Sequence, residues 1–386
     1  MAFLRLGLTS FGGPVAHLGY FRAEFVQRRR WLDERAYADL VGLCQFLPGP
    51  ASSQVGFGIG LLRGGWLGGL AAWTGITLPS AVLMILFAKF AGTLSTWPWG
   101  AGLLHGLKLV AVAIVAQAVW GMARSLCPDR ERASIANLAL VLVLFAPTSV
   151  GWICAIAGGA VVGLWVCRAS IDASDSRGPE VLATPVSRIA GTCRLVLFLA
   201  LLFLLPLMHE LGMGVVVFDA FYRSGSLVFE GGHVVLPLLR DAVVSPGWVS
   251  DTVFLVGYGA AQAMPGPLFT FAAYLGEVLP GSWGGLLGAT LALSALFLPG
   301  GLQLVGALPF WDSLRARPRM QAAMRGVNAA VVGLLGAALY DPVWTSAIHR
   351  PADYALALSG FVLLVIWQVP PLAVVMLGAL GGLAIG

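Results

Sequence analysis

The tripeptide Pro-Gly-Pro occurs twice within apolar stretches of the chain, at residues 48–50 and again at residues 265–267. Trp31 precedes the first copy and Trp248 the second, and the spacing from each tryptophan to its Pro-Gly-Pro is identical. Each proline removes a backbone N–H donor and clashes with the preceding helical turn, so no helix runs unbroken through either copy. The chain is therefore predicted to consist of two related halves, each with a broken helix at the same place.

The composition places the chain in a lipid bilayer. Of its 386 residues, 58% are hydrophobic and only 11% are charged, whereas soluble domains carry about 25% charged residues. The five cysteines lack the spacing of metal ligands, and the basic residues flank apolar spans instead of forming a nucleic-acid-binding patch. We therefore expect the bilayer as a partner, and no metal, cofactor or nucleic acid.

Other matched pairs extend the repeat over most of the chain. They are Gly12-Gly13 with Gly231-Gly232, Leu78-Pro79 with Leu298-Pro299, and Gly106-Leu107-Lys108 with Gly326-Val327-Asn328, all at nearly the same offset along the chain. We predict an N-terminal repeat at 1–167, a polar cytoplasmic linker at 168–194 and a C-terminal repeat at 195–386. The second repeat has an apolar lead-in before its glycine pair, so either the first repeat lacks one or the true start lies upstream of Met1.

Long apolar segments approach the roughly 20 residues that span a bilayer. They run over 66–92, 100–122, 133–147 and 150–167, and over 283–310, 321–340, 343–368 and 370–386. The Pro-Gly-Pro segments, 36–62 and 252–279, either cross once as broken helices or turn back as re-entrant pairs. Arginines crowd 22–35 and 124–132, while the turn at 93–99 has none. Re-entry puts these basic loops on one face, so we predict re-entry with that face in the cytoplasm.

The second half reverses this charge pattern. Its loop 240–251 has one arginine against two aspartates, whereas loop 311–325 has four arginines. Swapped basic loops imply opposite orientations in the membrane. The predicted fold is an all-α polytopic membrane protein with two inverted-topology repeats, about ten transmembrane helices and broken, re-entrant Pro-Gly-Pro segments. Paired helix breaks mark a substrate site near the midplane of repeat-built transporters, so transport is the expected function.

The first break carries side chains that suit an anion. The second part of a broken helix begins with free N–H groups and positive partial charge, and hydroxyl and amide side chains add donors there. The alternative is a structural kink whose backbone groups are satisfied by neighbouring helices. The candidate substrate-binding residues of the two breaks are Gln45, Pro48, Gly49, Pro50, Ser52, Ser53, Gln54, Gln262, Pro265, Gly266, Pro267 and Thr270.

Further candidates lie outside the breaks. Paired glycines let a ligand or another helix approach the backbone closely. Lys108 lies within an apolar span, where an unpaired ammonium is costly, so we expect it to face either a carboxylate or a wet, anion-binding cavity. Titratable groups near the glycine pairs either couple protons or are structural. The further substrate candidates are Ser10, Gly12, Gly13, Gly231, Gly232, Lys108 and Asn328, and the proton-coupling candidates are His17, His233 and Glu230.

The motifs together resemble the chromate ion transporter family in its long-chain, two-domain form. The stretches that carry the resemblance are Leu8 to Phe21, Gln45 to Gln54, Gly231 to Leu239, Gly257 to Phe271, and Gly326 to Gly333. The resemblance implies a multi-pass protein of the bacterial inner membrane that exports chromate, driven by the membrane potential or a proton gradient, and confers chromate resistance. Glu230 departs from the family pattern, in which a glycine is expected.

The expected function is that of a secondary transporter that exports chromate from the cytoplasm. Sulfate or another tetrahedral oxyanion is the alternative substrate, and a non-transporting membrane scaffold is a more remote alternative. An enzyme would need clustered carboxylates with a metal or a Ser/His/Asp arrangement, and the sequence shows neither, so we expect no enzymatic activity. The coupling ion and the oligomeric state, including a homodimer, are left open.

Overall fold

The computed structural model describes residues 1–11, 13–94, 97, 99–146, 149–167, 186–228, 235–311, 313 and 317–385, which form helices and connections with no β-strand among them. The first half contains α1 (Ala2–Thr9), α2 (Gly13–Phe21), η1 (Arg22–Arg28), α3 (Glu34–Phe46), α4 (Ala51–Leu94), α5 (Gly100–Leu126), α6 (Arg130–Phe145) and α7 (Ser149–Val166). The second half contains α8 (Arg188–Leu204), η2 (Leu205–Leu211), α9 (Met213–Ser226), α10 (Val235–Val243), α11 (Asp251–Ala261), η3 (Leu268–Thr270), α12 (Phe271–Glu277), η4 (Gly281–Trp283), α13 (Gly285–Ala307), η5 (Leu308–Phe310), α15 (Pro318–Ala338), η6 (Leu339–Trp344), α16 (Pro351–Val365) and α17 (Pro371–Ile385).

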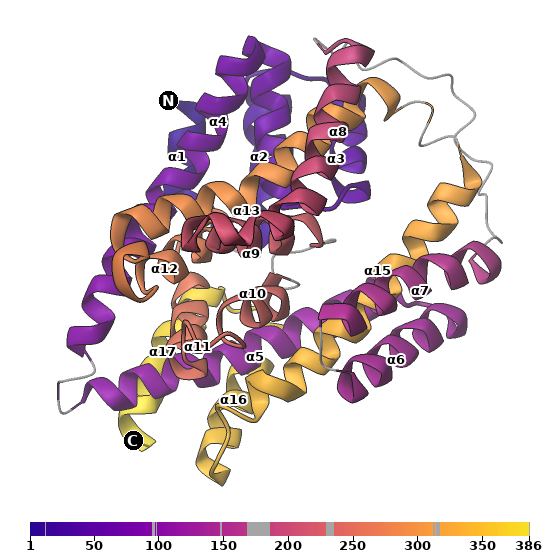
Figure 1. The fold of residues 1–386 in the computed structure, drawn as a ribbon. Coiled ribbons are helices and arrows are strands. Elements are labelled where there is room, and N and C mark those ends of the chain that lie inside the picture. The colour runs from indigo at the N-terminus through magenta and orange to yellow at the C-terminus, as the bar shows by residue number, and fades with distance from the viewer. Residues whose placement is uncertain are drawn as a thin grey trace.

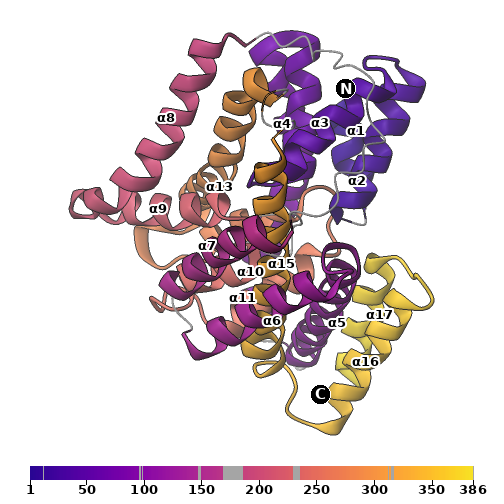
Figure 2. The same ribbon diagram turned by 90° about the vertical axis from the view of Figure 1, so that its right-hand side faces the viewer.

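The helices form two layers, and each layer contains parts of both halves (Figure 1). One layer holds α1 to α4 with α8, α9, α12 and α13. The other holds α5 to α7 with α15 to α17, while α10 and α11 lie between the layers. The view turned by 90° shows the same division (Figure 2). The two halves are therefore interleaved in space.

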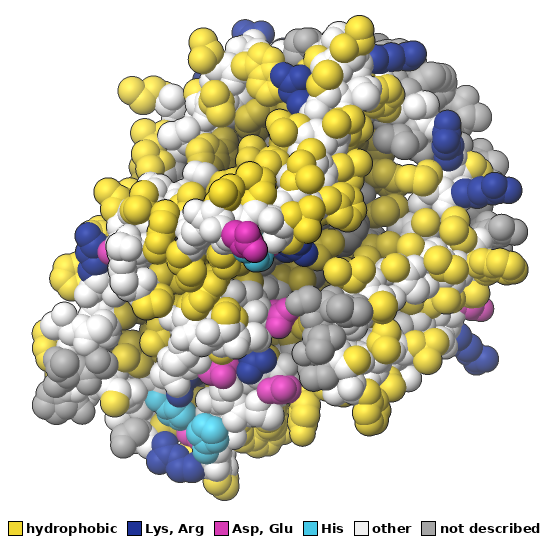
Figure 3. Space-filling model, in the orientation of Figure 1, with side chains coloured by type: hydrophobic (Ala, Val, Ile, Leu, Met, Phe, Trp, Pro, Cys, Tyr) yellow, Lys and Arg dark blue, Asp and Glu magenta, His cyan; other side chains and the backbone are white. Residues whose placement is uncertain are grey.

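The exposed surface is that of a membrane protein. Hydrophobic side chains cover much of the face in Figure 3, over both layers. Some large apolar side chains are almost fully exposed: Phe145 is 87% exposed and Leu67 is 80% exposed. Water would not tolerate so large an apolar surface on a monomer, whereas lipid accepts it.

Five helices of the described chain are long and apolar enough to cross a membrane, so the expected ten spans are not confirmed. They are Ala51–Thr93, Gly100–Leu126, Arg188–Leu211, Gly285–Phe310 and Pro318–Trp344. Three shorter apolar helices, Gly151–Val166, Pro351–Val365 and Pro371–Ile385, fall below the usual spanning length. Ser187 caps α8, so this helix begins at Arg188, within the range 168–194 that is predicted for the linker.

Both Pro-Gly-Pro segments reverse the chain. Asp33 caps α3 by accepting a hydrogen bond from Ala36 N–H, and Ser250, its counterpart in the second half, caps α11. After the first break, Gly58 of α4 packs against Leu40 of α3. After the second, α12 folds back onto α11. A straight helix would separate residues 40 and 58 by about 27 Å, so these segments are helical hairpins.

Each half contributes one long helix that packs against the last two helices of the other half. Helix α5 lies against α16 and α17, and α15 lies against α6 and α7. Glycines allow the close approach: Gly106 of α5 meets Gly378 of α17, and Gly326 of α15 meets Gly159 of α7. Gly106 and Gly326 are residues that the sequence matched between the halves. The crossed contact is thus made at equivalent positions of the two halves.

Candidate functional site

The two Pro-Gly-Pro loops are each held by the opposite half of the chain. Gly49 N–H donates to the carbonyl of Val228 at 2.6 Å, and Gly266 N–H donates to the carbonyl of Ser10 at 2.8 Å. Ser10 and Val228 occupy corresponding places, each shortly before the glycine pair of its half. The structure therefore ties each break to the opposite half, through one reciprocal pair of backbone hydrogen bonds.

A side chain after each break strengthens the hold on the opposite half. Gln54 Nε2 donates to Pro48 O at 3.1 Å and to Gly300 O, on α13, at 3.0 Å. In the second loop, Thr270 Oγ1 donates to Pro267 O at 2.8 Å. Its oxygen lies 2.7 Å from Ser80 Oγ of α4, which is therefore the donor of that bond.

The helices that receive these contacts are the ones that contain Pro79 and Pro299. Ser80 and Gly300 follow those prolines directly and so occupy equivalent positions in the two halves. Both had a sequence signal, because the Leu-Pro pairs before them are matched in the two halves. Neither residue was among the predicted site residues, since the match does not show that the loops dock there.

Several buried polar atoms around the loops have no hydrogen-bond partner among the described residues. They are Ser10 Oγ, Ser53 Oγ, Gln54 Oε1, Trp73 Nε1, Thr77 Oγ1 and Gln303 Nε2. An unpaired buried polar atom costs about 1–3 kcal/mol, so such groups are rare in native proteins unless water or a ligand completes them. Two of them are N–H groups, which only donate, three are hydroxyls, which can donate, and Gln54 Oε1 only accepts. The surroundings of the loops therefore suit a ligand that is rich in acceptors.

The two matched glutamines lie in different environments. Gln45 is exposed, whereas Gln262 is half-buried and its Nε2 has no partner in the described chain. The reason is the neighbour of each hairpin: α11 packs closely on α5, with Gly259 against the Leu107 carbonyl, while the matching Gly42 of α3 meets the ring of Trp311. From the sequence, both glutamines were predicted to bind substrate in equivalent positions.

Lys108 is half-buried on α5. It directly follows Leu107, whose carbonyl contacts Gly259 of α11. In the part of the chain that the structure describes, its ammonium forms no ion pair, although Asp353 acts on it electrostatically. Asp353 is fully buried and is held by His105 Nε2 at 2.9 Å and by two backbone N–H groups at the start of α16. Asn328, the counterpart of Lys108, is also half-buried, and its Oδ1 lacks a partner among the described residues.

The remaining sequence candidates are placed only in part. His17 is buried, and its Nε2 donates to Ser10 O at 3.2 Å, the carbonyl that also accepts from Gly266. Ser52 is buried in the first turn of α4, and Gly13 begins α2 with a φ of +77°. Pro50, Pro265 and Pro267 are buried, and Pro48 is half-buried. The candidates Gly12, Glu230, Gly231, Gly232 and His233 lie outside the described residues.

A pocket of about 300 Å³ opens beside the first loop, between α4, α8 and α13. Three sequence candidates line it, namely Pro50, Ser53 and Gln54. Trp73 and Arg194 line it as well and were not predicted, because only the fold brings α8 against the first half of the chain.

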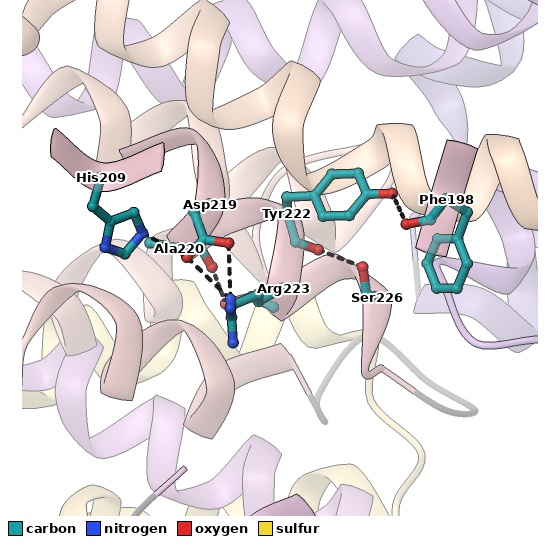
Figure 4. Close-up of polar contacts among 8 residues, drawn as sticks. Phe198, His209, Asp219, Ala220, Tyr222, Arg223 and Ser226 are labelled. Carbon is teal, nitrogen blue, oxygen red and sulfur yellow. Dashed lines mark hydrogen bonds and ion pairs between the residues drawn. The ribbon is translucent and has the colours of Figure 1, made fainter. Parts of the chain in front are cut away.

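A second polar cluster was also missed by sequence reasoning. Asp219 of α9 is buried, and its carboxylate lies 2.9 Å from His209 Nε2 and 2.8 Å from Arg223 Nε (Figure 4). The arginine follows the aspartate at the i,i+4 spacing, which brings side chains together on one helix face. The cluster neutralises a buried carboxylate on the helix that leads to Val228. Among the described residues, no three His, Cys, Asp or Glu side chains converge as a metal site, here or elsewhere.

Comparison with known proteins gives a consistent result. Residues 1–164 and 215–383 match the family described as chromate transporter. The chain is 30% identical over 384 residues to a chromate transport protein of Pseudomonas aeruginosa, covering 95% of this chain and 86% of that protein. It is 26% identical to a chromate transport protein of Cupriavidus metallidurans (91% and 83% covered) and 24% identical to an uncharacterized transporter of Methanocaldococcus jannaschii (87% and 81% covered). No solved structure matches the chain significantly.

Proposed function

Because the chain belongs to the chromate transporter family, we propose that it is a secondary transporter that exports chromate across the bacterial inner membrane and confers chromate resistance. The observation that carries the proposal is the pair of Pro-Gly-Pro loops, each hydrogen-bonded to the opposite half and surrounded by buried donors without partners among the described residues. A tetrahedral oxyanion has four acceptor oxygens and no donor when fully ionised. It therefore complements a site made of N–H and O–H groups.

The two repeats, 1–167 and 195–386, are inverted in the membrane and flank a cytoplasmic linker at 168–194. Crossed contacts between equivalent positions support this arrangement. Gly49 with Val228 mirrors Gly266 with Ser10, and the glycine contacts of α5 with α17 mirror those of α15 with α7. In such a fold, a movement of one repeat displaces the loop that it holds in the other repeat. The site then opens to alternate faces of the membrane.

The membrane potential supplies a driving force for export. Moving one charge through 100 mV changes the free energy by about 2.3 kcal/mol, so an inside-negative potential of that size favours outward movement of a dianion by roughly 4.6 kcal/mol. The protein has to let the anion cross without the hydration that bulk water provides. The buried donors without partners and the half-buried ammonium of Lys108 replace that hydration, at a moderate cost in the stability of the protein.

Accessibility of two exposed residues, one in each half, tests the inverted arrangement. In a background whose five native cysteines are replaced, a cysteine at Ser245 is expected to react with an impermeant maleimide added outside intact cells. A cysteine at Gln27 is expected to react only after permeabilisation, because the basic loop 22–35 is cytoplasmic. Both positions are exposed in the structure, so burial does not separate them. Equal labelling of both in intact cells would end the inverted-repeat proposal.

The chromium content of cells tests the direction of chromate transport. Cells that produce the chain are expected to hold less chromium after chromate exposure than matched cells carrying an empty vector, and to grow at higher chromate concentrations. Chromium content is measured in washed cells at equal density. Higher chromium content in the producing cells would show import and contradict export.

A further inference from the structure

The pocket beside the first Pro-Gly-Pro loop is lined in part by residues that belong to none of the sequence motifs. Helix α13 lies between α4 and α8 in both views (Figures 1 and 2), and the pocket of about 300 Å³ lies where these helices meet. Pro50 and Gln54 of the broken helix line it. Trp66 and Arg194 also line it, and Trp66 is 44% exposed. The pocket thus connects the loop to the outside of the helix layer.

The side of the molecule on which it opens follows from the chain path. Arg194 lies in the second turn of α8, where this helix emerges from the linker region. Trp66 directly follows the Gly64-Gly65 kink that joins the two arms of α4, next to Arg63. Both residues therefore lie at the basic face, which the proposed topology makes cytoplasmic.

Two walls of the pocket carry buried donors with nothing to bind among the described residues. Ser53 is 4% exposed and its Oγ has no partner in that part of the chain. Trp73, on the second arm of α4, likewise has a buried Nε1 without a hydrogen-bond partner in the described chain. Both residues line the pocket. An indole N–H can only donate, so the complementary ligand presents acceptor oxygens.

Arg194 adds a positive charge to the same pocket. Its guanidinium lies over the ring of Trp66, 4.3 Å from the centroid, and Nη1 donates to Ala190 O at 2.8 Å. It forms no ion pair with a carboxylate in the described part of the chain, so its charge is available to a ligand. The rest of the wall is mostly apolar, with Leu70, Phe297 and Val305 beside the hydroxyl-bearing Ser294, and an apolar wall strengthens the attraction between an arginine and an anion.

We propose that this pocket is the cytoplasmic access site for the oxyanion, with Arg194 as the residue that first binds it and Ser53 and Trp73 as the donors that receive it next to the loop. The inference rests on the proposed transport function and deepens it by naming a binding residue on α8. A lipid phosphate presents the same oxygens as the substrate, so the experiment separates these two sources.

The test is the concentration dependence of initial chromate flux in proteoliposomes of zwitterionic lipid, repeated in proteoliposomes that also contain anionic lipid. Arg194→Gln is expected to raise KM about ten-fold or more with a much smaller change in maximal rate, because a charge-assisted contact is lost at the binding step. Arg194→Lys is expected to recover part of the affinity, since the charge remains but the planar donor fork does not. Ser53→Ala and Trp73→Phe are each expected to raise KM several-fold.

Arg124→Gln is the matched control. Arg124 also lies over a tryptophan, 5.0 Å from the Trp120 ring, but it lines a different groove. Its variant is expected to keep the parent KM. The inference fails if Arg194→Gln keeps the parent KM, or if Arg194→Gln and Arg124→Gln lose flux equally and only when anionic lipid is present, which would assign Arg194 to lipid headgroups. Absence of chromate flux from the parent would instead reject the proposed function itself.

Discussion

Replacement of Gly49 by alanine is expected to abolish chromate transport, and Gly266→Ala is expected to do the same. Gly49 has a φ of +128° and Gly266 a φ of +96°, and side-chain-bearing residues in such conformations cost about 1–3 kcal/mol. A Cβ on Gly49 would also lie 2.7 Å from Gln54 Nε2 and 3.0 Å from Gly300 Cα. The loop would have to shift, and its bond to Val228 O would break. Resistance of cells to chromate, at protein levels matched by immunoblot, measures the effect.

Gly121→Ala is the control for these two variants. Gly121 lies within α5, and an added Cβ there meets nothing within 4 Å. Alanine favours helix over glycine by up to about 1 kcal/mol, so this variant is expected to transport as well as the parent. Full transport by both Gly49→Ala and Gly266→Ala would show that the loops do not need their observed geometry.

Lys108→Gln is expected to abolish transport or weaken it strongly. The side chain is half-buried and forms no ion pair with the described residues, so its charge is available to a dianion beside the second hairpin. Lys108→Arg is expected to keep part of the activity, because the charge survives although the shape changes. Asn328→Ala, at the matched position of α15, is expected to be milder, because only a neutral amide is lost. Flux at matched protein level is the measurement.

Lys89→Gln is the control for charge alone. Lys89 is the only other lysine of the chain, it is exposed, and it lies 3.8 Å from Glu277. The Glu277 side chain is only 9% exposed, but the pair is long and its lysine faces outward, so we expect a small effect and normal transport. Protection against chromate by Lys108→Gln equal to that of the parent would remove Lys108 from the pathway.

The sequence was sufficient to predict the membrane class, the two helix breaks and the matched positions of the halves. These features depend on local chemistry. Proline at residues 48 and 50 stops α3 wherever the helix lies, and the low charge of the chain requires a bilayer. The family was also identified from the motifs, and the comparisons confirm it.

The contacts at the site could not be predicted in the same way. The repeat offset places Gly49 opposite Gly266 in an alignment, but only the fold shows that each loop is held by the other half. The offset likewise made Gln45 and Gln262 equivalent, whereas α5 covers one hairpin and Trp311 the other. Arg194 lies in a helix for which the repeat supplied no matched motif, so its role could not be inferred from sequence.

Apolar windows do not determine which helices are long enough to cross the membrane, and five helices of the described chain reach that length. The windows at 133–147 and 150–167 become α6 and α7, and α7 is held against α15 by close contacts at Gly159 and Gly163. The window at 343–368 is interrupted, since α16 begins only at Pro351 after the kinked segment around Pro342. Short helices of this kind are stabilised by packing on a long neighbour, which hydropathy alone does not reveal.

The measurement that most directly tests the account is the flux of chromate, sulfate and molybdate into proteoliposomes that contain the purified chain, with a membrane potential imposed by a potassium gradient. We expect chromate to accumulate in the compartment made positive, faster than sulfate or molybdate, and to do so only with the parent protein and not with Gly49→Ala. Flux of all three anions no greater than in protein-free liposomes, with the parent folded and inserted, would contradict transport. Faster flux of sulfate than of chromate would contradict the assigned substrate.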